Sequence, residues 1–172
     1  MKKFKRAFLE LEIEEKVILI SSMTLVLSCL FPWLVSQNYI NYTEESINAF
    51  NGLLSAHGYT VFFSALFCVL LMVIPFYRVK LPKFLAPTYV IYPAVFIVNC
   101  LVIALAIFAY MKYSLIDNRA DIGFGIYMSF FASMAGSVFS ILNYKRNSRK
   151  GLVDTRKESR MFESEQTQKL NL

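Results

Sequence analysis

Residues 121–144 read DIGFGIYMSFFASMAGSVFSILNY, and this stretch decides the fold. No charged side chain follows Asp121 until Lys145, yet the stretch holds three glycines, four serines and two alanines. A run of about 20 mostly apolar residues is long enough to cross the roughly 30 Å hydrocarbon core of a bilayer as a helix. The stretch therefore predicts a membrane-spanning helix at 122–144 that is unusually rich in small residues.

The small residues of this predicted helix share one face, because they recur every four positions in two adjacent rows. One row is Gly125, Ser129, Ser133 and Ser137, and the other is Ala132, Gly136 and Ser140. Helices in lipid associate through close backbone approach and interhelical hydrogen bonds. We interpret this face as a helix-packing surface, used either within this chain or against another subunit. We favour the first use, since several helices need a common core.

Three further uncharged runs give predicted spans at 17–34, 59–77 and 89–110 in addition to 122–144. The chain is 56% hydrophobic and only 17% charged, whereas soluble domains average about 25% charged. Strict two-residue alternation is absent, which argues against a membrane β-barrel. The sequence thus predicts an all-α integral membrane four-helix bundle over residues 17–144, with up-down-up-down topology.

Basic residues predict the orientation of this bundle. Sixteen of the 18 Lys and Arg residues fall in the segments 1–16, 78–83 and 145–172, which the four spans place on one side. Segments dense in Lys and Arg stay cytoplasmic, so both termini are predicted to be cytoplasmic in a multi-pass protein of the inner membrane. The net charge of +6 follows from this asymmetry and favours anionic lipid as a partner, with no need for nucleic acid.

Segments outside the spans also have predicted structures. Residues 1–16 form either a cytoplasmic amphipathic segment or a frayed start of the first span. Residues 36–56 form a polar outer loop, with Trp33 just before it as an interfacial ring at the outer end of the first span. Residues 145–172 combine many charges with few apolar residues, which predicts a disordered basic cytoplasmic tail.

Asn99 is the deepest strongly polar side chain in the predicted spans, and no acidic or basic residue lies within any of them. Proton-coupled transporters and voltage sensors place ionisable groups inside the bilayer, so these activities are not expected here. We interpret Asn99 as an interhelical contact, with a serine of the span 122–144 as its partner. A pore-lining role is the alternative.

Residues suited to chemistry are few. His57, Glu44, Glu45, Asp117 and Asp121 map to the outer side, where they could bind a metal, but solvated loop acids are the simpler interpretation. We expect Asp121 to cap the helix at 122–144. No catalytic, nucleotide-binding or metal-binding motif occurs. We therefore predict no enzyme activity, no cofactor and no metal site.

A set of aromatic and glycine residues is shared with a group of known proteins. The set comprises Pro32-Trp33, Phe50-Asn51-Gly52, Gly58-Tyr59, Gly123, Gly125, Tyr127 and Gly136. In these residues the chain resembles small, largely uncharacterised bacterial four-span membrane proteins, and the resemblance implies architecture alone. Claudin-like tetraspan proteins share the topology, but their first outer loop carries a cysteine pair that this chain lacks.

Three functional hypotheses follow from the sequence. The first is a non-enzymatic integral membrane subunit or scaffold of a membrane complex, with protein partners or a second copy of the chain. The second is an oligomeric pore or small-solute carrier formed around the span 122–144 and Asn99. The third is a lipid-modifying enzyme that uses Asp117 and Asp121, although no motif supports it.

Overall fold

The computed structural model describes residues 9, 11–38, 43–74, 88–114 and 120–170 of the chain. Most of these residues belong to four α-helices, in agreement with the predicted helical fold, and a small sheet is added. In chain order the elements are α2 (Ile13–Ser28), β1 (Pro32–Asn38), β2 (Thr43–Asn48), the 3₁₀ turn η1 (Gly52–Leu54), α3 (Ser55–Val73), α4 (Thr88–Ser114), β3 (Ala120–Ile122) and α5 (Phe124–Leu170).

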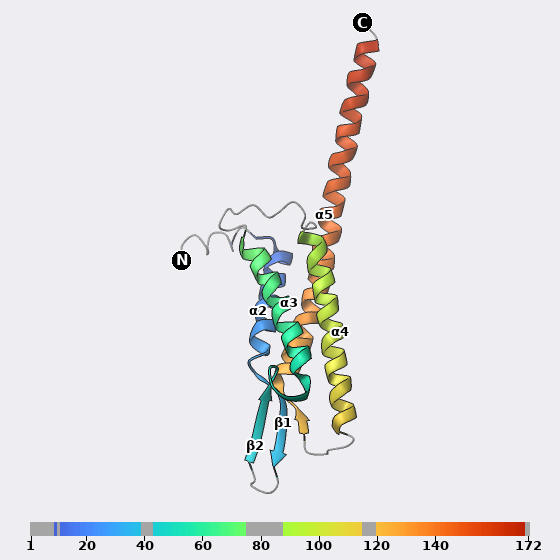
Figure 1. Ribbon diagram of the computed structural model, residues 1–172. Coiled ribbons are helices and arrows are strands. Elements are labelled where there is room, and N and C mark those ends of the chain that lie inside the picture. The colour runs from blue at the N-terminus through green and yellow to red at the C-terminus, as the bar shows by residue number, and fades with distance from the viewer. Residues whose placement is uncertain (1–8, 10, 39–42, 75–87, 115–119, 171–172) are drawn as a thin grey trace.

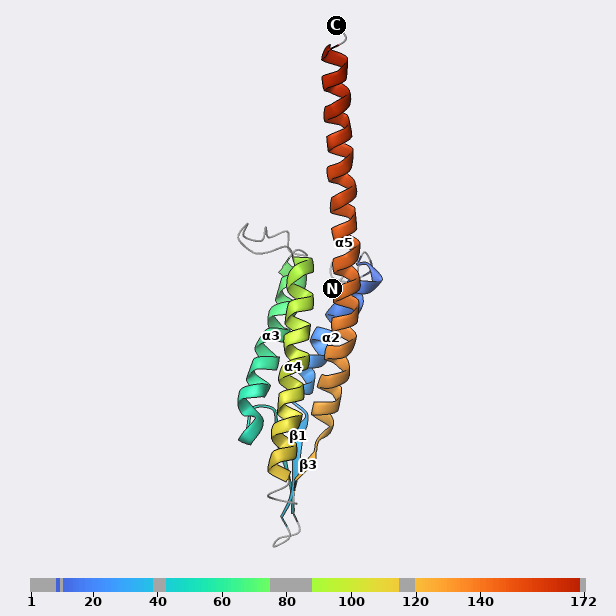
Figure 2. The ribbon, with the colours of Figure 1, turned by 90° about the vertical axis from the view of Figure 1, so that its right-hand side faces the viewer.

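The four α-helices pack side by side, with consecutive helices running in opposite directions (Figure 1). α5 contacts α2 and α4, and α3 contacts the same two helices. Each helix thus touches its neighbours in the chain, and α5 closes the bundle onto α2. The view turned by 90° shows the sheet at one end of the bundle and the last part of α5 beyond the other end (Figure 2).

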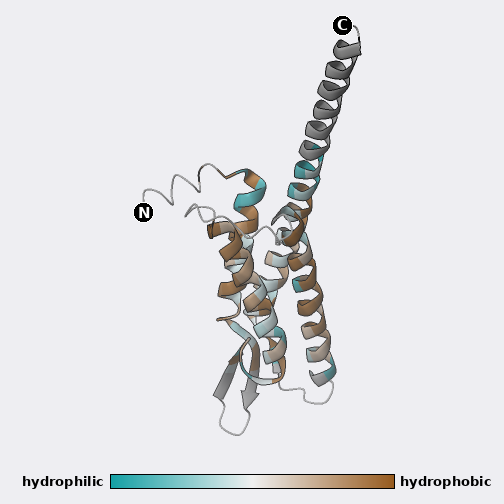
Figure 3. Ribbon diagram, turned by 45° about the horizontal axis from the view of Figure 1, so that its top comes forward, coloured by the Kyte–Doolittle hydropathy of each residue, from teal (hydrophilic) through white to brown (hydrophobic). Residues whose placement is uncertain are grey.

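The bundle buries several polar side chains within its apolar core and exposes many large apolar side chains on its outside. Phe131 is 68% exposed and Phe108 is 66% exposed, and much of the helical ribbon within the bundle has the brown colour of hydrophobic residues (Figure 3). The buried polar residues are Ser21, Ser22, Ser28, Asn99, Ser129, Ser133, Ser140 and Asn143. Water-soluble proteins rarely expose apolar surface on this scale. This distribution is the one expected of helices surrounded by lipid.

Three helices in the described residues are long and apolar enough to cross a membrane. They cover Gly52–Val73, Tyr89–Lys112 and Phe124–Arg149, with mean hydropathies of 1.9, 2.6 and 1.5. They correspond to the predicted spans 59–77, 89–110 and 122–144. The prediction for 17–34 is wrong as a continuous helix, because α2 ends at Ser28 and the chain enters β1 at Pro32, where proline cannot supply an amide proton to a helix.

The sheet is three-stranded and antiparallel, in the order β2-β1-β3. β1 pairs with β2 from Pro32 opposite Asn48 to Asn38 opposite Thr43. These strands occupy the end of the predicted span 17–34 and part of the predicted polar loop 36–56, so they correct the all-α prediction. Asp121 lies in β3 opposite Val35, and α5 begins only at Phe124. The prediction that Asp121 caps this helix is therefore wrong.

α5 continues as a helix to Leu170, whereas the sequence analysis predicted a disordered tail from residue 145. Lys, Arg, Glu and Gln are frequent in this segment, and all four have good helix propensity. Helix initiation is costly while elongation is cheap. The segment therefore extends a helix that is already started within the bundle.

The predicted amphipathic segment at 1–16 falls mainly outside the described residues. Its last residues form the start of α2, which begins at Ile13. Glu12 is the N-cap residue of this helix, and its backbone amide donates to the Glu15 carboxylate over 3.2 Å. Glu14 and Glu15 in the first turn also face the positive end of the helix dipole, which stabilises the helix start.

Candidate functional site

The six residues predicted to pack helices all lie inside the bundle. Gly125, Ser129, Ala132, Ser133, Gly136 and Ser140 of α5 are buried, and α5 packs between α2 and α4. We call this set the small-residue face. Because it is covered by helices of the same chain, it is used for internal packing in this structure.

Towards α2, the small-residue face makes a hydrogen bond between helices. The hydroxyl oxygens of Ser28 and Ser129 are 2.6 Å apart, and both serines are fully buried. One turn earlier, a side chain at Gly125 would lie 2.6 Å from the Trp33 ring and 2.7 Å from the Ser28 carbonyl oxygen. Glycine at this position therefore allows α5 to approach both residues closely.

On the side that faces α4, the small-residue face contacts the Cys100 thiol and the Phe96 ring. The Cys100 thiol donates to the Ser133 hydroxyl over 3.3 Å and lies 3.6 Å from the Ser137 hydroxyl. The Phe96 ring occupies the space above Gly136, so that a β-carbon there would overlap it. These contacts fix the register of α4 against α5.

Gly136→Ala is expected to lower the free energy of unfolding in detergent by about 1–2 kcal/mol, because Phe96 must move to admit the methyl group. Chemical unfolding followed by circular dichroism would measure the change. Ala104→Leu is the control, since Ala104 is exposed on α4 and gains size without a neighbour to displace. Equal stabilities of the two variants would contradict the close packing at Gly136.

Asn99 is fully buried and contacts α3, whereas the sequence analysis expected a serine of the last span. The Ser64 hydroxyl donates to Asn99 Oδ1 over 2.6 Å, and Asn99 Nδ2 has no partner among the described residues. If the amide were turned over, its oxygen would be the unpaired atom instead. Ser64 therefore supplies the one side-chain hydrogen bond described for this amide.

Ser64→Ala is expected to destabilise the bundle by about 1 kcal/mol, because it leaves the buried Asn99 amide without its hydroxyl partner. Thr60→Ala is the matched control. Thr60 lies one turn earlier on α3, is exposed, and its hydroxyl donates only to the Ala56 carbonyl over 2.8 Å. The same unfolding titration should leave that variant unchanged, and an equal loss in both variants would argue against the Asn99 contact.

Trp33 is fully buried at the junction of the sheet and the bundle, so its prediction as an interfacial ring is wrong. Its indole Nε1 donates to the Ser28 carbonyl over 3.1 Å. Its own carbonyl accepts the Gly123 amide over 2.8 Å. A side chain at Gly123 would overlap the Pro32 carbonyl. Trp33 thus joins the end of α2 to the start of α5.

The start of α3 also packs against this junction. The Ala49 amide donates to the Cys29 carbonyl over 3.3 Å, and a side chain at Gly58 would overlap the Ala49 carbonyl. Gly123 and Gly125 therefore lie against Pro32 and Trp33, and Gly58 lies against Ala49. These glycines and Pro32-Trp33 belong to the residues that carried the resemblance, and the structure brings them to one place that sequence reasoning did not identify.

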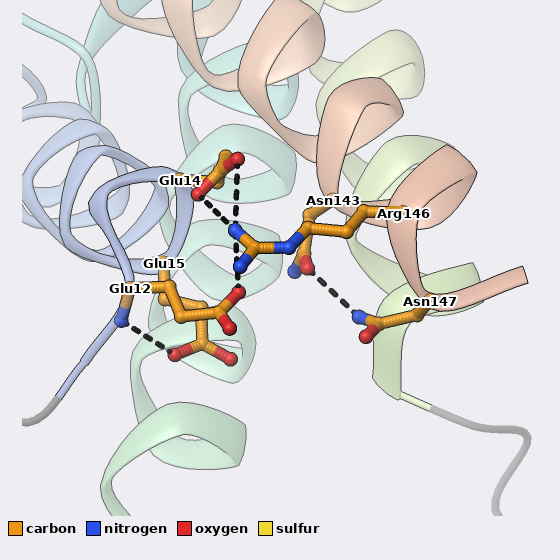
Figure 4. A network of polar contacts seen from close by, with 6 residues as sticks. All are labelled: Glu12, Glu14, Glu15, Asn143, Arg146 and Asn147. Carbon is orange, nitrogen blue, oxygen red and sulfur yellow. Dashed lines mark hydrogen bonds and ion pairs between the residues drawn. The ribbon is translucent and has the colours of Figure 1, made fainter. Parts of the chain in front are cut away.

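At the opposite end of the bundle, an arginine of α5 binds two carboxylates at the start of α2 (Figure 4). Arg146 Nη1 lies 2.9 Å from a Glu12 oxygen and 3.2 Å from both Glu14 oxygens. The Arg146 side chain is 43% exposed, so each pair contributes less than about 1 kcal/mol. We call Glu12, Glu14 and Arg146 the charged cluster. The sequence gives no local signal for it, because its members lie far apart in the chain.

The other candidate residues do not come together as a metal-binding cluster in the described part of the chain. No three His, Cys, Asp or Glu side chains lie close enough there to hold a metal ion. Asp117 lies outside the described residues. His57 is partly buried on α3, and its Nδ1 has no partner among the described residues.

Comparison with known proteins adds no constraint. No protein-family model, curated protein or solved structure matches this chain.

Proposed function

We propose that this chain is a multi-pass integral membrane protein with four spans, formed by α2, α3, α4 and the first half of α5. The exposed apolar surface and buried serines support this proposal. α2 has 16 residues and covers about 24 Å, somewhat less than the roughly 30 Å hydrocarbon core. The exposed side chains of Leu30 and Phe31 extend its apolar surface towards the sheet.

The proposed orientation places the sheet outside the cell and the charged cluster at the cytoplasmic surface of the inner membrane. The distribution of Lys and Arg supports it. Protease added to sealed vesicles of known orientation tests it, because the segment 145–170 should be cleaved only in vesicles whose cytoplasmic side faces outward. Cleavage in the opposite orientation would overturn this assignment.

We further propose that the protein is a non-enzymatic subunit or scaffold of a membrane complex. The observation that carries this proposal is the second half of α5, which continues to Leu170 beyond the ends of the other helices (Figure 1). In proteins most of the stability of a helix comes from tertiary packing and not from helix propensity. A protein partner on the cytoplasmic side would supply the missing packing surface.

Deleting residues 151–172 is therefore expected to release a partner while leaving the bundle in the membrane. Crosslinking in native membranes, affinity purification and mass spectrometry would compare the full chain with the truncated chain. Sizing in mild detergent should show a complex for the full chain alone. A monodisperse monomer with no co-purifying protein in both cases would contradict the scaffold proposal.

The alternative is an oligomeric pore or small-solute carrier, and the geometry supports it less well. A pore between copies needs polar side chains on an outer helix surface. The small-residue face and Asn99 are instead buried within one chain. Flux through liposomes that depends on Asn99, measured with Asn99→Leu against the wild-type chain, would revive this alternative.

A further inference from the structure

The strand β2 forms one edge of the sheet, and its outer side pairs with no other strand among the described residues. The strand order β2-β1-β3 gives β2 a single neighbour. The two strands pair from Leu34 opposite Ile47 to Asn38 opposite Thr43, and Figure 1 shows them beyond the ends of α2 and α3. An edge strand presents a row of backbone groups with which a further strand can pair.

The direction of the backbone groups of β2 follows from the register of the sheet. The Trp33 carbonyl accepts the Gly123 amide over 2.8 Å, so it points towards β3. This direction alternates from residue to residue in an antiparallel sheet. The backbone of Leu34 therefore points towards β2, where Leu34 lies opposite Ile47. Ile47 faces β1 in return, and Ser46 directs its N–H and C=O away from the sheet.

The same alternation defines the whole outer edge. Glu44 and Asn48 direct their backbone groups the same way as Ser46, because they lie two residues before and after it. The Asn48 carbonyl accepts the Asn51 amide over 3.3 Å, so only its amide belongs to the outer edge. Ser46 lies in the middle and is exposed. An extended chain along this edge would make about five backbone hydrogen bonds.

A second copy of the protein in the same membrane does not fit this edge. β1 and β2 run along the long axis of the bundle (Figures 1 and 2), which is the membrane normal in the proposed orientation. Antiparallel pairing of two β2 strands would reverse one copy and turn its bundle away from the shared bilayer. Parallel pairing about a two-fold axis would place each N–H opposite its own equivalent. The strand that fits is therefore part of a different chain.

The charge of β2 indicates the chemistry of that chain. β2 contains Glu44 and Glu45, and the whole segment 32–56 contains no Lys, Arg or His. Opposite charges on neighbouring strands favour pairing, while like charges directly opposite each other disfavour it. Charge complementarity also speeds the encounter between two chains. A segment with Lys or Arg at alternate positions fits this edge, and an acidic segment does not.

We infer that the outer edge of β2 binds an extended segment, rich in Lys or Arg, of another protein on the outer side of the membrane. The segment would add a fourth strand to the sheet, so that backbone hydrogen bonds supply the affinity and the charges supply the selectivity. This inference rests on the proposed orientation and subunit role. It gives the proposed complex a second contact, at the end of the bundle opposite to the end of α5.

The test is an NMR titration of the isotopically labelled full chain in mild detergent. The probe is a capped ten-residue peptide of alternating lysine and threonine. We expect the Ser46 amide signal to shift, and its hydrogen exchange to slow by about ten-fold at saturation. The same peptide with glutamate in place of lysine should bind about five-fold more weakly or less.

Two substitutions at one position separate the edge from other surfaces. Ser46→Pro removes the outward amide, which an edge strand tolerates, and should weaken binding of the lysine peptide about five- to ten-fold. Ser46→Ala keeps this amide and should stay within about two-fold of the wild type. Slow exchange of the Ile47 amide, which faces β1, would show that the sheet is intact in each variant.

Three results would each overturn the inference. They are an unchanged Ser46 signal with the lysine peptide, equal binding of the two peptides by the wild-type chain, and equal binding by the proline and alanine variants. The titration in detergent does not depend on how the chain crosses a membrane. Cleavage of the segment 145–170 from the wrong side of sealed vesicles would therefore count against the proposed orientation, and would leave the result for this edge intact.

Discussion

Trp33→Ala is expected to lower the free energy of unfolding by about 3–5 kcal/mol, the cost of removing a large aromatic side chain from a fixed core. Trp33 is fully buried and touches both the end of α2 and the start of α5. Its loss opens a cavity where three elements meet. Chemical unfolding in mild detergent, followed by circular dichroism, would measure the change.

Two further variants separate the causes of this loss. Trp33→Phe keeps a ring and removes the indole N–H, so it should cost about 1 kcal/mol for the lost hydrogen bond plus a smaller cavity term. Phe31→Ala is the matched control, because Phe31 lies two residues earlier and is 43% exposed. Similar losses in Trp33→Ala and Phe31→Ala would contradict the buried junction.

Gly58→Ala is expected to destabilise the protein by about 3 kcal/mol, at the upper end of the usual cost of overpacking. The new methyl group would overlap the Ala49 carbonyl, which is backbone and cannot rotate away. The segment after β2 must therefore move away from α3. The same unfolding titration measures this effect, and a lower yield of the folded protein should accompany it.

Ala56→Leu is the control for this substitution. Ala56 lies in the first turn of α3 and is exposed, so a larger side chain there should change the stability by less than about 0.5 kcal/mol. If Gly58→Ala stayed within the same limit, the close approach of α3 to Ala49 would be contradicted.

The helices could be predicted from the sequence because lipid leaves a strong local signal. An uncharged run of sufficient length identifies a span wherever it occurs, and α3, α4 and the first half of α5 were found in this way. The small-residue face was found by its four-residue spacing. The contact partners of these residues could not be predicted in the same way, because the spacing of residues on one helix does not show which other helix packs against them. Asn99 is an example: a serine of α5 was the predicted partner, but the structure pairs Asn99 with Ser64 of α3.

The sheet could not be predicted because its signals are weak and non-local. β1 begins at Pro32, soon after α2 ends at Ser28. β3 has only three residues, and they pair with a strand far earlier in the chain. The charged cluster is similar, as Glu14 and Arg146 are separated by 132 positions. The glycines at 58, 123 and 125 did carry a usable signal, since each stands at the start of a predicted span. Only the structure shows that Gly123 and Gly125 lie against Trp33 and that Gly58 lies against Ala49.

α5 is a single helix of 47 residues, and it joins the sheet end of the bundle to a point well beyond the opposite end (Figure 2). Its last 26 residues, from Lys145 to Leu170, measure about 39 Å at 1.5 Å per residue. A helix of this kind acts as a lever arm. If the bundle tilts by about 10° in the bilayer, Leu170 moves by about 7 Å. A small tilt of the bundle would thus become a large displacement at the end of α5, where the proposed partner would bind.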